Sequence, residues 1–236
     1  MATELFAEPD FRWRSDEITR IESFSDAVFG FAVTLLVVSL KVPRSYDELM
    51  AAMSNFPAFA VCFAILASIW HAHYRYFRRY ALQTPIAITL SCALLFVLLF
   101  YVYPLKFVFV GVFGSQPDLQ AHQARVLYAI YGLGYAAISL VLWGLYAHAW
   151  SHREALELSA IERLLTRHSL IDFAAQTVIG LAGVSLAWLL PLGWLPLAGY
   201  FYFVLGAYYW TAHSLFGRQV RALRAQIADS VAAAST

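Results

Sequence analysis

Residues 20–40 read RIESFSDAVFGFAVTLLVVSL, a segment that is strongly apolar after Val28 but carries Glu22 and Asp26 near its start. A membrane-spanning helix needs about 20 mostly apolar residues, so the segment is long enough to cross a bilayer. A carboxylate inside a span is costly, by about 2.5–3.5 kcal/mol at the helix centre and less near an end. We therefore expect Asp26 to have a partner, whereas Glu22 should lie nearer the membrane surface.

The composition of the whole chain is that of an integral membrane protein. Of 236 residues, 61% are apolar and 13% are charged, against roughly half and about a quarter in soluble domains. Such a chain has too few polar residues to cover a soluble core. The net charge of +1 gives no general attraction to nucleic acid, and we expect no such partner. Two cysteines inside apolar stretches do not indicate a disulfide scaffold.

Charge-free stretches predict further spanning helices. Residues 49–74, 80–105 and 126–152 hold no Asp, Glu, Lys or Arg. A longer charge-free stretch, 173–217, contains PLGWLP at 191–196, which predicts a turn between two helices. The sequence thus predicts an all-α membrane protein with six transmembrane helices, at residues 20–41, 50–74, 82–104, 125–150, 170–190 and 196–216.

Lys and Arg residues gather beside one set of the predicted helix ends, which are cytoplasmic by the positive-inside rule. These residues are Arg12, Arg14, Arg20, Arg75, Arg78, Arg79, Arg153, Arg163, Arg167, Arg218, Arg221 and Arg224. The opposite side holds Lys41, Arg44, Lys106 and Arg125. We expect a multi-pass protein of the cell (inner or plasma) membrane with both termini cytoplasmic. Its predicted parts are an N-terminal segment (1–19), a membrane domain (20–217) and a C-terminal tail (218–236).

The connection between the fourth and fifth predicted spans has its own helical pattern. Ser151 and Glu154 have the spacing of a capping box. Leu158, Ile161 and Leu165 then repeat at helical spacing. This pattern predicts an amphipathic helix at the cytoplasmic surface or a continuation of the fourth span.

Motifs of soluble enzymes are absent, so we expect no enzyme activity, no cofactor and no metal site. His71 and His73 would point about 200° apart on a helix and could not share an ion. His148 and His152 are four apart and could, but near a membrane surface such a pair is more often an interfacial feature. The chain also lacks a TVGYG-type carbonyl filter.

One stripe of the first helix is apolar with a single hydroxyl. Its bulky members are Phe31, Leu35 and Val38, which fall within about 60° of one another at the helical period. Thr34 borders the stripe, whereas Ser25 and Asp26 face elsewhere. Periodicity alone favours an ordinary packing or lipid-facing stripe.

The first two predicted helices carry motifs that resemble a known family. Residues 20–26 match RxxxFSD, the signature of the transmembrane protein 175 family of endosomal and lysosomal potassium channels and their prokaryotic homologues. Residues 70–77, WHAHYRYF, resemble the WxxHHxxF stretch of the same family. Chain length and predicted topology are similar to those of a prokaryotic member with one six-helix repeat.

The resemblance implies a homotetramer in which four first helices line a central pore for potassium ions. It assigns a constriction of bulky apolar side chains to Phe31, Leu35 and Val38, and a selectivity role to Thr34. Such a constriction would close the pore by dewetting, and we expect only weak selectivity for potassium. Phe31 stands where members usually have Ile or Leu, and Tyr74 stands where a second His is common.

The same motifs imply a buried polar network between the first two spans near the cytoplasmic side. Its members would be Arg20, Phe24, Ser25, Asp26, Trp70 and His73. The Trp70 indole N–H and His73 can both hydrogen-bond the Asp26 carboxylate. This network could be a structural staple or part of the gate.

Two other functions stay open at this point. A small proton-coupled transporter could use Asp26 and His73 as a relay, although its helices would usually be broken at the midplane. A non-conducting membrane scaffold is the third possibility. In each case lipids surround the chain.

Overall fold

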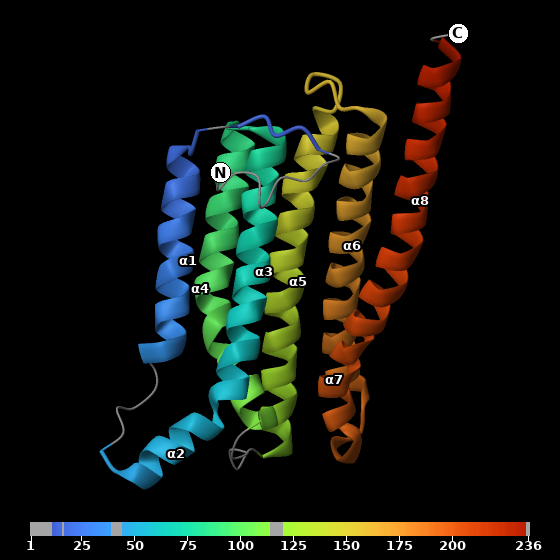
Figure 1. Ribbon diagram of the computed structural model, residues 1–236. Helices are drawn as coiled ribbons and strands as arrows, with labels where there is room; N and C mark the ends of the chain where they lie inside the picture. The colour runs from blue at the N-terminus through green and yellow to red at the C-terminus, as the bar shows by residue number, and fades with distance from the viewer. Residues whose placement is uncertain (1–10, 16, 39–43, 114–119, 235–236) are drawn as a thin grey trace.

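The computed structural model describes residues 11–15, 17–38, 44–113 and 120–234, and its regular elements in these ranges are helical. They are α1 (Arg20–Val38), α2 (Tyr46–Ser54), α3 (Phe56–Tyr80), α4 (Pro85–Phe113), α5 (Ala121–Ser151), α6 (Ala160–Leu189), α7 (Pro196–Tyr200) and α8 (Val204–Ala234). The long helices α1 and α3 to α6 stand side by side as a bundle with α1 at one edge (Figure 1).

Four of the described helices are long and apolar enough to cross a membrane. They are Phe56–Tyr80, Pro85–Gly111, His122–Ser151 and Ala160–Leu189. The predicted span 50–74 is divided in the structure, because α2 ends at Ser54 and α3 starts at Phe56 with Pro57 in its first turn. Proline is tolerated there because the first helical N–H groups have no partner inside the helix.

The prediction for the connection between the fourth and fifth spans is only partly correct. Helix α5 runs to Ser151, and a turn with Glu157 at φ 49° follows. The capping box that forms is Ser159 with Glu162, and it starts α6 well before the expected residue 170. The spacing S-x-x-E occurs twice within a few residues, and only the second copy follows a chain reversal. Ile161 and Leu165 are therefore helical, as predicted, but they belong to the first turns of α6 rather than to a separate surface helix or an extension of α5.

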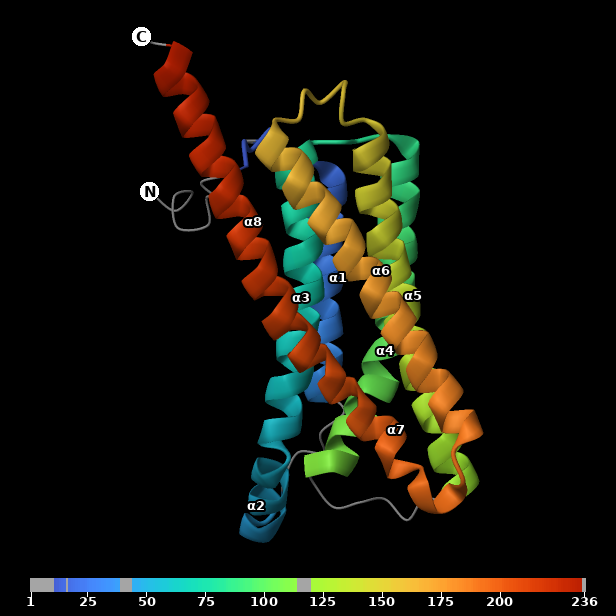
Figure 2. The ribbon, with the colours of Figure 1, turned by 90° about the vertical axis from the view of Figure 1, so that its right-hand side faces the viewer.

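The last predicted span is interrupted at its start. Helix α6 ends at Leu189, and a 3₁₀ turn (Leu192–Trp194), α7 and a second 3₁₀ turn (Phe201–Phe203) precede α8. The predicted turn at 191–196 is confirmed. Helix α8 crosses the bundle obliquely and ends at the same end of the molecule at which α1 begins (Figures 1 and 2).

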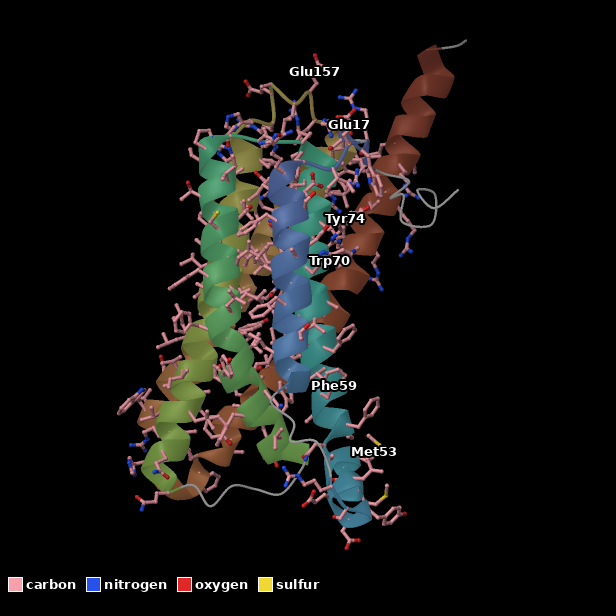
Figure 3. The ribbon with its side chains drawn as sticks, turned by 90° about the vertical axis from the view of Figure 1, so that its left-hand side faces the viewer. Glu17, Met53, Phe59, Trp70, Tyr74 and Glu157 are labelled. Carbon is pink, nitrogen blue, oxygen red and sulfur yellow. The ribbon has the colours of Figure 1, made fainter. Side chains whose placement is uncertain are left out.

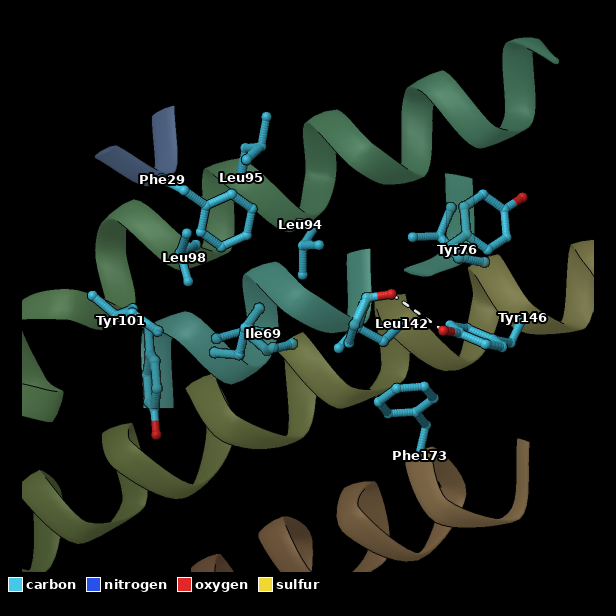
Figure 4. Close-up of a cluster of buried hydrophobic side chains, with 14 of the residues drawn as sticks. Phe29, Ile69, Tyr76, Leu94, Leu95, Leu98, Tyr101, Leu142, Tyr146 and Phe173 are labelled. Atoms are coloured by element: carbon cyan, nitrogen blue, oxygen red, sulfur yellow. Dashed lines mark hydrogen bonds between the residues drawn. The ribbon is translucent and has the colours of Figure 1, made fainter. Parts of the chain in front are cut away.

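The core lies where α3, α4 and α5 meet, with α1 and α6 packed on either side. Buried aromatic and aliphatic side chains fill it, among them Tyr76, Leu98 and Tyr146 (Figure 4). The Tyr146 hydroxyl donates to the Ala72 carbonyl oxygen at 3.1 Å, which ties α5 to α3. Helix α1 joins this core through Phe29 and its neighbours on one face.

Candidate functional site: the first helix and its contacts

Helix α1 begins with a closed cap. The Thr19 backbone N–H donates to Glu22 Oε2 at 2.9 Å, and the Glu22 N–H donates to Thr19 Oγ1 at 3.3 Å. Both bonds together form a capping box, which satisfies amides that the helix itself cannot pair. Glu22 lies in the first turn of α1 and is only 5% exposed, so the chain itself buries the carboxylate that closes the capping box.

One face of α1 is buried against α3 and α4. It consists of Ser25, Phe29, Ala32 and Leu36. The Phe29 ring lies 6.2 Å from the His73 ring of α3. The Ser25 hydroxyl is fully buried and has no hydrogen-bond partner among the described residues. The side chains of this face therefore anchor α1 mainly by apolar packing.

The opposite face of α1 is an exposed stripe. We call it the outer stripe; its members are Phe24, Ala27, Phe31, Thr34 and Val37. Phe31 is 55% exposed, whereas Phe29 on the buried face is 4% exposed. Figure 3 looks onto α1 from outside the bundle, and no other helix of the chain lies in front of it. Lipid or another protein copy must cover this stripe in a membrane.

The residues expected at the constriction divide between the two faces. Phe31 and Thr34 lie on the outer stripe, and the Thr34 hydroxyl donates to the Gly30 carbonyl oxygen at 2.9 Å. Leu35 is half-buried and packs against the core cluster. The side chain of Val38 lies outside the described residues. Val37, which helical geometry did not single out, is exposed beside Thr34.

The expected hydrogen bond between Trp70 and Asp26 is present. The indole N–H of Trp70 donates to Asp26 Oδ1 at 2.7 Å and joins α3 to α1. The Trp70 ring also stacks on Tyr74 with centroids 5.5 Å apart (Figure 3). Asp26 itself is exposed in the single chain. Tyr74, in the position of the second histidine, thus supports the tryptophan that holds the carboxylate.

His73 and Arg20, two other expected members of the network, form no contact with Asp26 in the structure. His73 is buried and its Nε2 contacts Ser91 Oγ of α4 at 3.1 Å. Arg20 is exposed at the first turn and forms no hydrogen bond or ion pair with the described members of the network. The indole–carboxylate pair and the His73–Ser91 pair are therefore two separate contacts between helices. Ser91 belongs to no recognisable motif, so the second pair could not be predicted from the sequence.

Lys106 lies within α4 and contacts the far end of α1. Its ammonium donates to the Leu36 carbonyl oxygen at 2.9 Å, which satisfies one of the last carbonyls of α1. An apolar cavity of about 200 Å³ lies beside it, lined by residues that include Val37, Met53 and Phe59. The charge pattern alone predicts Lys106 only as a charge beside a helix end.

The described residues hold no cluster of three or more His, Cys, Asp or Glu side chains that could bind a metal ion. The rings of His148 and His152 lie 4.5 Å apart. His148 Nε2 contacts Thr84 Oγ1 at 2.7 Å, and His152 Nδ1 lies 2.9 Å from the His148 carbonyl oxygen. Through these contacts the two histidines link the end of α5 to the start of α4.

Comparison with known proteins gives consistent matches. The family model described as endosomal/lysosomal potassium channel TMEM175 matches residues 20–104. A potassium channel of Marivirga tractuosa is 38% identical over 213 residues, which cover 83% of this chain and 86% of the relative.

Two solved structures are similar over most of the chain. A crystal structure of a variant of the potassium channel MtTMEM175 has a TM-score of 0.75 and 34% identity, over 91% of this chain and 98% of that one. A lysosomal potassium-selective channel TMEM175 homolog from Chamaesiphon minutus has a TM-score of 0.57 and 25% identity, over 85% and 96%.

Proposed function

The chain belongs to the endosomal/lysosomal potassium channel TMEM175 family, and on that premise we propose that it forms a weakly selective, potassium-permeable cation channel. It is a multi-pass membrane protein and not an enzyme. The proposed channel is a homotetramer with α1 around a central pore. Its permeant ion needs no bound cofactor.

The observation that supports this proposal most directly is the outer stripe of α1. Bulky apolar side chains such as Phe24 and Phe31 occupy an edge of the bundle that no described part of the chain covers. A closed ring of identical copies can bring such an edge to a common axis. If α1 stood at the outer boundary instead, lipid would cover the same stripe, and this is the alternative that experiment must exclude.

Apolar rings on the axis would act as the gate. Phe31 would form the first ring, and Leu35 and Val38 would form rings further along α1. A narrow apolar constriction excludes water and so blocks hydrated ions. Because Leu35 is half-buried in the single chain, it would enter the pore only if α1 turned about its axis. We propose that this rotation is part of opening.

Thr34 supplies the hydroxyl nearest to the proposed constriction. Its hydrogen is used by the Gly30 carbonyl at 2.9 Å, but the oxygen keeps a free lone pair that can face a cation. Four such oxygens would replace only part of a hydration shell. Weak selectivity for potassium over sodium follows.

The proposed topology has six spans with both termini cytoplasmic. Helix α1 is short and carries two carboxylates, but Glu22 is capped and Asp26 is bonded to Trp70. The last span would comprise α7 and the first half of α8. Helix α8 continues past residue 217 to Ala234, so the proposed boundaries 1–19, 20–217 and 218–236 follow the membrane surface rather than helix ends.

The contacts of Asp26 and His73 argue against a proton relay between them. Asp26 is bonded to Trp70, whose indole cannot accept a proton from it. His73 points to Ser91 of α4. A transporter that used both residues would need a different arrangement of α1 and α3.

Ion flux through purified protein in liposomes tests the proposed function. A potassium gradient should drive flux that does not depend on a proton gradient. Uptake that requires a proton gradient would establish the transporter, and the absence of any flux would establish a non-conducting scaffold. Empty liposomes from the same preparation are the control.

A further inference from the structure

The chain that leads into α1 is fastened across one end of the bundle. We call residues 11–15 the strap. In Figure 1 it crosses the end of the bundle at which α1 begins, on its way from the α5–α6 turn. Only residues 16–19 separate it from the first residue of α1. Where the strap is held therefore limits where α1 can start.

Arg14 is the centre of this attachment. Its Nη1 donates to Glu162 Oε1 and its Nη2 to Glu162 Oε2, both at 3.0 Å. The side chains of Arg14 and Glu162 are only 10% and 5% exposed. Two parallel bonds between a planar guanidinium and a carboxylate fix orientation as well as distance. The pair joins the strap to the first turn of α6.

The same guanidinium also reaches α3 and the α5–α6 turn. Nη1 donates to the Arg79 carbonyl oxygen at 3.0 Å, and Nη2 donates to the Leu156 carbonyl oxygen at 3.1 Å. Arg14 thus joins the strap to two segments that are remote from it in sequence, the end of α3 and the α5–α6 turn with the first turn of α6. A lysine could make at most part of these contacts, because its ammonium lacks the planar fork.

Backbone and ring contacts extend the attachment on both sides of Arg14. The Arg14 N–H donates to the Arg78 carbonyl oxygen at 3.0 Å, and Arg78 Nη1 donates to the Ser15 carbonyl oxygen at 2.9 Å. The Phe11 ring packs edge-on against Tyr80, with centroids 5.5 Å apart. These contacts hold the strap along the last turn of α3.

We propose that Arg14 and Glu162 are a positioning pair that sets the rotation and tilt of the pore helix. This inference rests on the proposed function, because it assumes that α1 lines the pore. Helix α1 is packed on one face only, so the direction from which the strap enters is one of the few constraints on its first turns. Breaking the pair frees that entry point while the α3–α5 core stays intact.

The alternative is that the pair only stabilises the folded chain. Its loss would then lower thermal stability and loosen the strap, but each folded channel would conduct as before. Two readouts separate these roles. One is cation flux per folded protein, and the other is deuterium uptake by the amides of residues 20–30 in α1, which needs no conduction.

Glu162→Gln is the test variant, because glutamine can keep the cap at Ser159 but loses the charge. Glu154→Gln is the matched control, since Glu154 forms an exposed ion pair with Arg153 at the same end. We expect Glu162→Gln to raise deuterium uptake in residues 20–30 and to change flux by about fivefold or more, the lower end of usual coupling factors. Glu154→Gln should leave both unchanged.

Arg14→Lys provides a milder change if Glu162→Gln folds poorly, and it should shift both readouts in the same direction. The double variant should shift flux no further than Glu162→Gln alone, because both changes break one contact. Unchanged flux and unchanged uptake in α1, with faster exchange in the strap only, would overturn the proposal. Wild-type protein that conducts no cations would refute the proposed function instead, while the uptake experiment would still decide whether the pair positions α1.

Discussion

The α5–α6 contact and the outer stripe of α1 are opposite kinds of helix surface. Helices α5 and α6 approach so closely that a Cβ atom added at Gly180 would lie 2.9 Å from the Cβ of Ala136 and 3.0 Å from its backbone nitrogen. A Cβ at Gly30, which adjoins the outer stripe, would meet no atom within 4 Å. Both surfaces are apolar, but only the first finds its complement within the same chain.

The α5–α6 contact is part of the folded scaffold of one chain, whereas the outer stripe is a surface that needs a partner. Small residues let helices pack closely inside membranes, where contact rather than the hydrophobic effect holds them together. The α5–α6 contact is complete in one copy of the chain. The outer stripe keeps bulky side chains, Phe24 and Phe31 among them, without such a complement. Sequence changes should therefore disturb folding at the first surface and assembly or conduction at the second.

The largest difference in stability should separate two phenylalanines of α1. Phe29→Ala empties a closed site that includes the His73 ring, and truncations of this kind cost about 3–5 kcal/mol in soluble cores. Phe31→Ala removes a ring that is already exposed in the chain and should cost less than about 1 kcal/mol. Thermal unfolding of the detergent-solubilised protein measures both. Equal losses for the two variants would mean that Phe31 is packed as a core residue.

Glycine positions sharpen the same comparison. Gly180→Ala should destabilise the protein by about 1–3 kcal/mol, because the new methyl group meets backbone atoms of α5 that cannot move aside. Gly30→Ala should be neutral or gain up to about 1 kcal/mol from helix propensity. Thermal unfolding again provides the measurement. A loss at Gly30 as large as that at Gly180 would show that another surface already packs closely against that position.

The bond between Trp70 and Asp26 should carry a measurable coupling between α3 and α1. A double-mutant cycle with Trp70→Phe and Asp26→Asn should give about 1 kcal/mol, since a charged hydrogen bond is worth more than a neutral one but this pair is partly exposed. A second cycle, with Glu22→Gln instead of Asp26→Asn, is the control. It should show no coupling to Trp70. Zero coupling for the first pair would mean that this bond does not help to hold α1 against α3.

The smallest expected effect concerns ion selectivity. Thr34→Ala removes the hydroxyl beside the proposed constriction and should bring potassium and sodium permeabilities closer together. Thr34→Ser keeps the oxygen and should behave nearly as wild type. Reversal potentials under bi-ionic conditions provide the measurement. If the alanine variant keeps the wild-type reversal potential, pore width rather than Thr34 sets the preference.

Charge-free stretches predicted the regions of the four helices that are long and apolar enough to cross a membrane, because the cost of burying charge in lipid is the dominant constraint on such a chain. They failed where local geometry decides. Asn55 and Pro57 divide the second predicted span, and Ser159 rather than Ser151 caps α6. The S-x-x-E spacing indicates which residues can cap a helix. Of the two places where it occurs, only the one that follows the chain reversal forms a capping box.

Helical periodicity placed Phe31 and Thr34 on one side of α1. The cost of a buried carboxylate predicted that Asp26 has a partner, and the resemblance to the family motifs indicated Trp70 as that partner. The separation of His73 from Asp26 could not be predicted. His73 contacts Ser91 of α4 instead, and no sequence pattern links His73 to Ser91. The Arg14–Glu162 pair was missed for the same reason. Long-range pairs become visible only when the helices are assembled.

The central claim is that the outer stripe of α1 faces an ion pathway, and cation flux of Phe31→Ala in liposomes tests it most directly. Phe29→Ala, reconstituted at equal amounts of folded protein, is the matched control. Removal of a dewetting barrier should make Phe31→Ala conduct more than wild type while its oligomer elutes unchanged on size exclusion. Wild-type flux from an intact Phe31→Ala oligomer would place Phe31 away from the pathway and contradict the account.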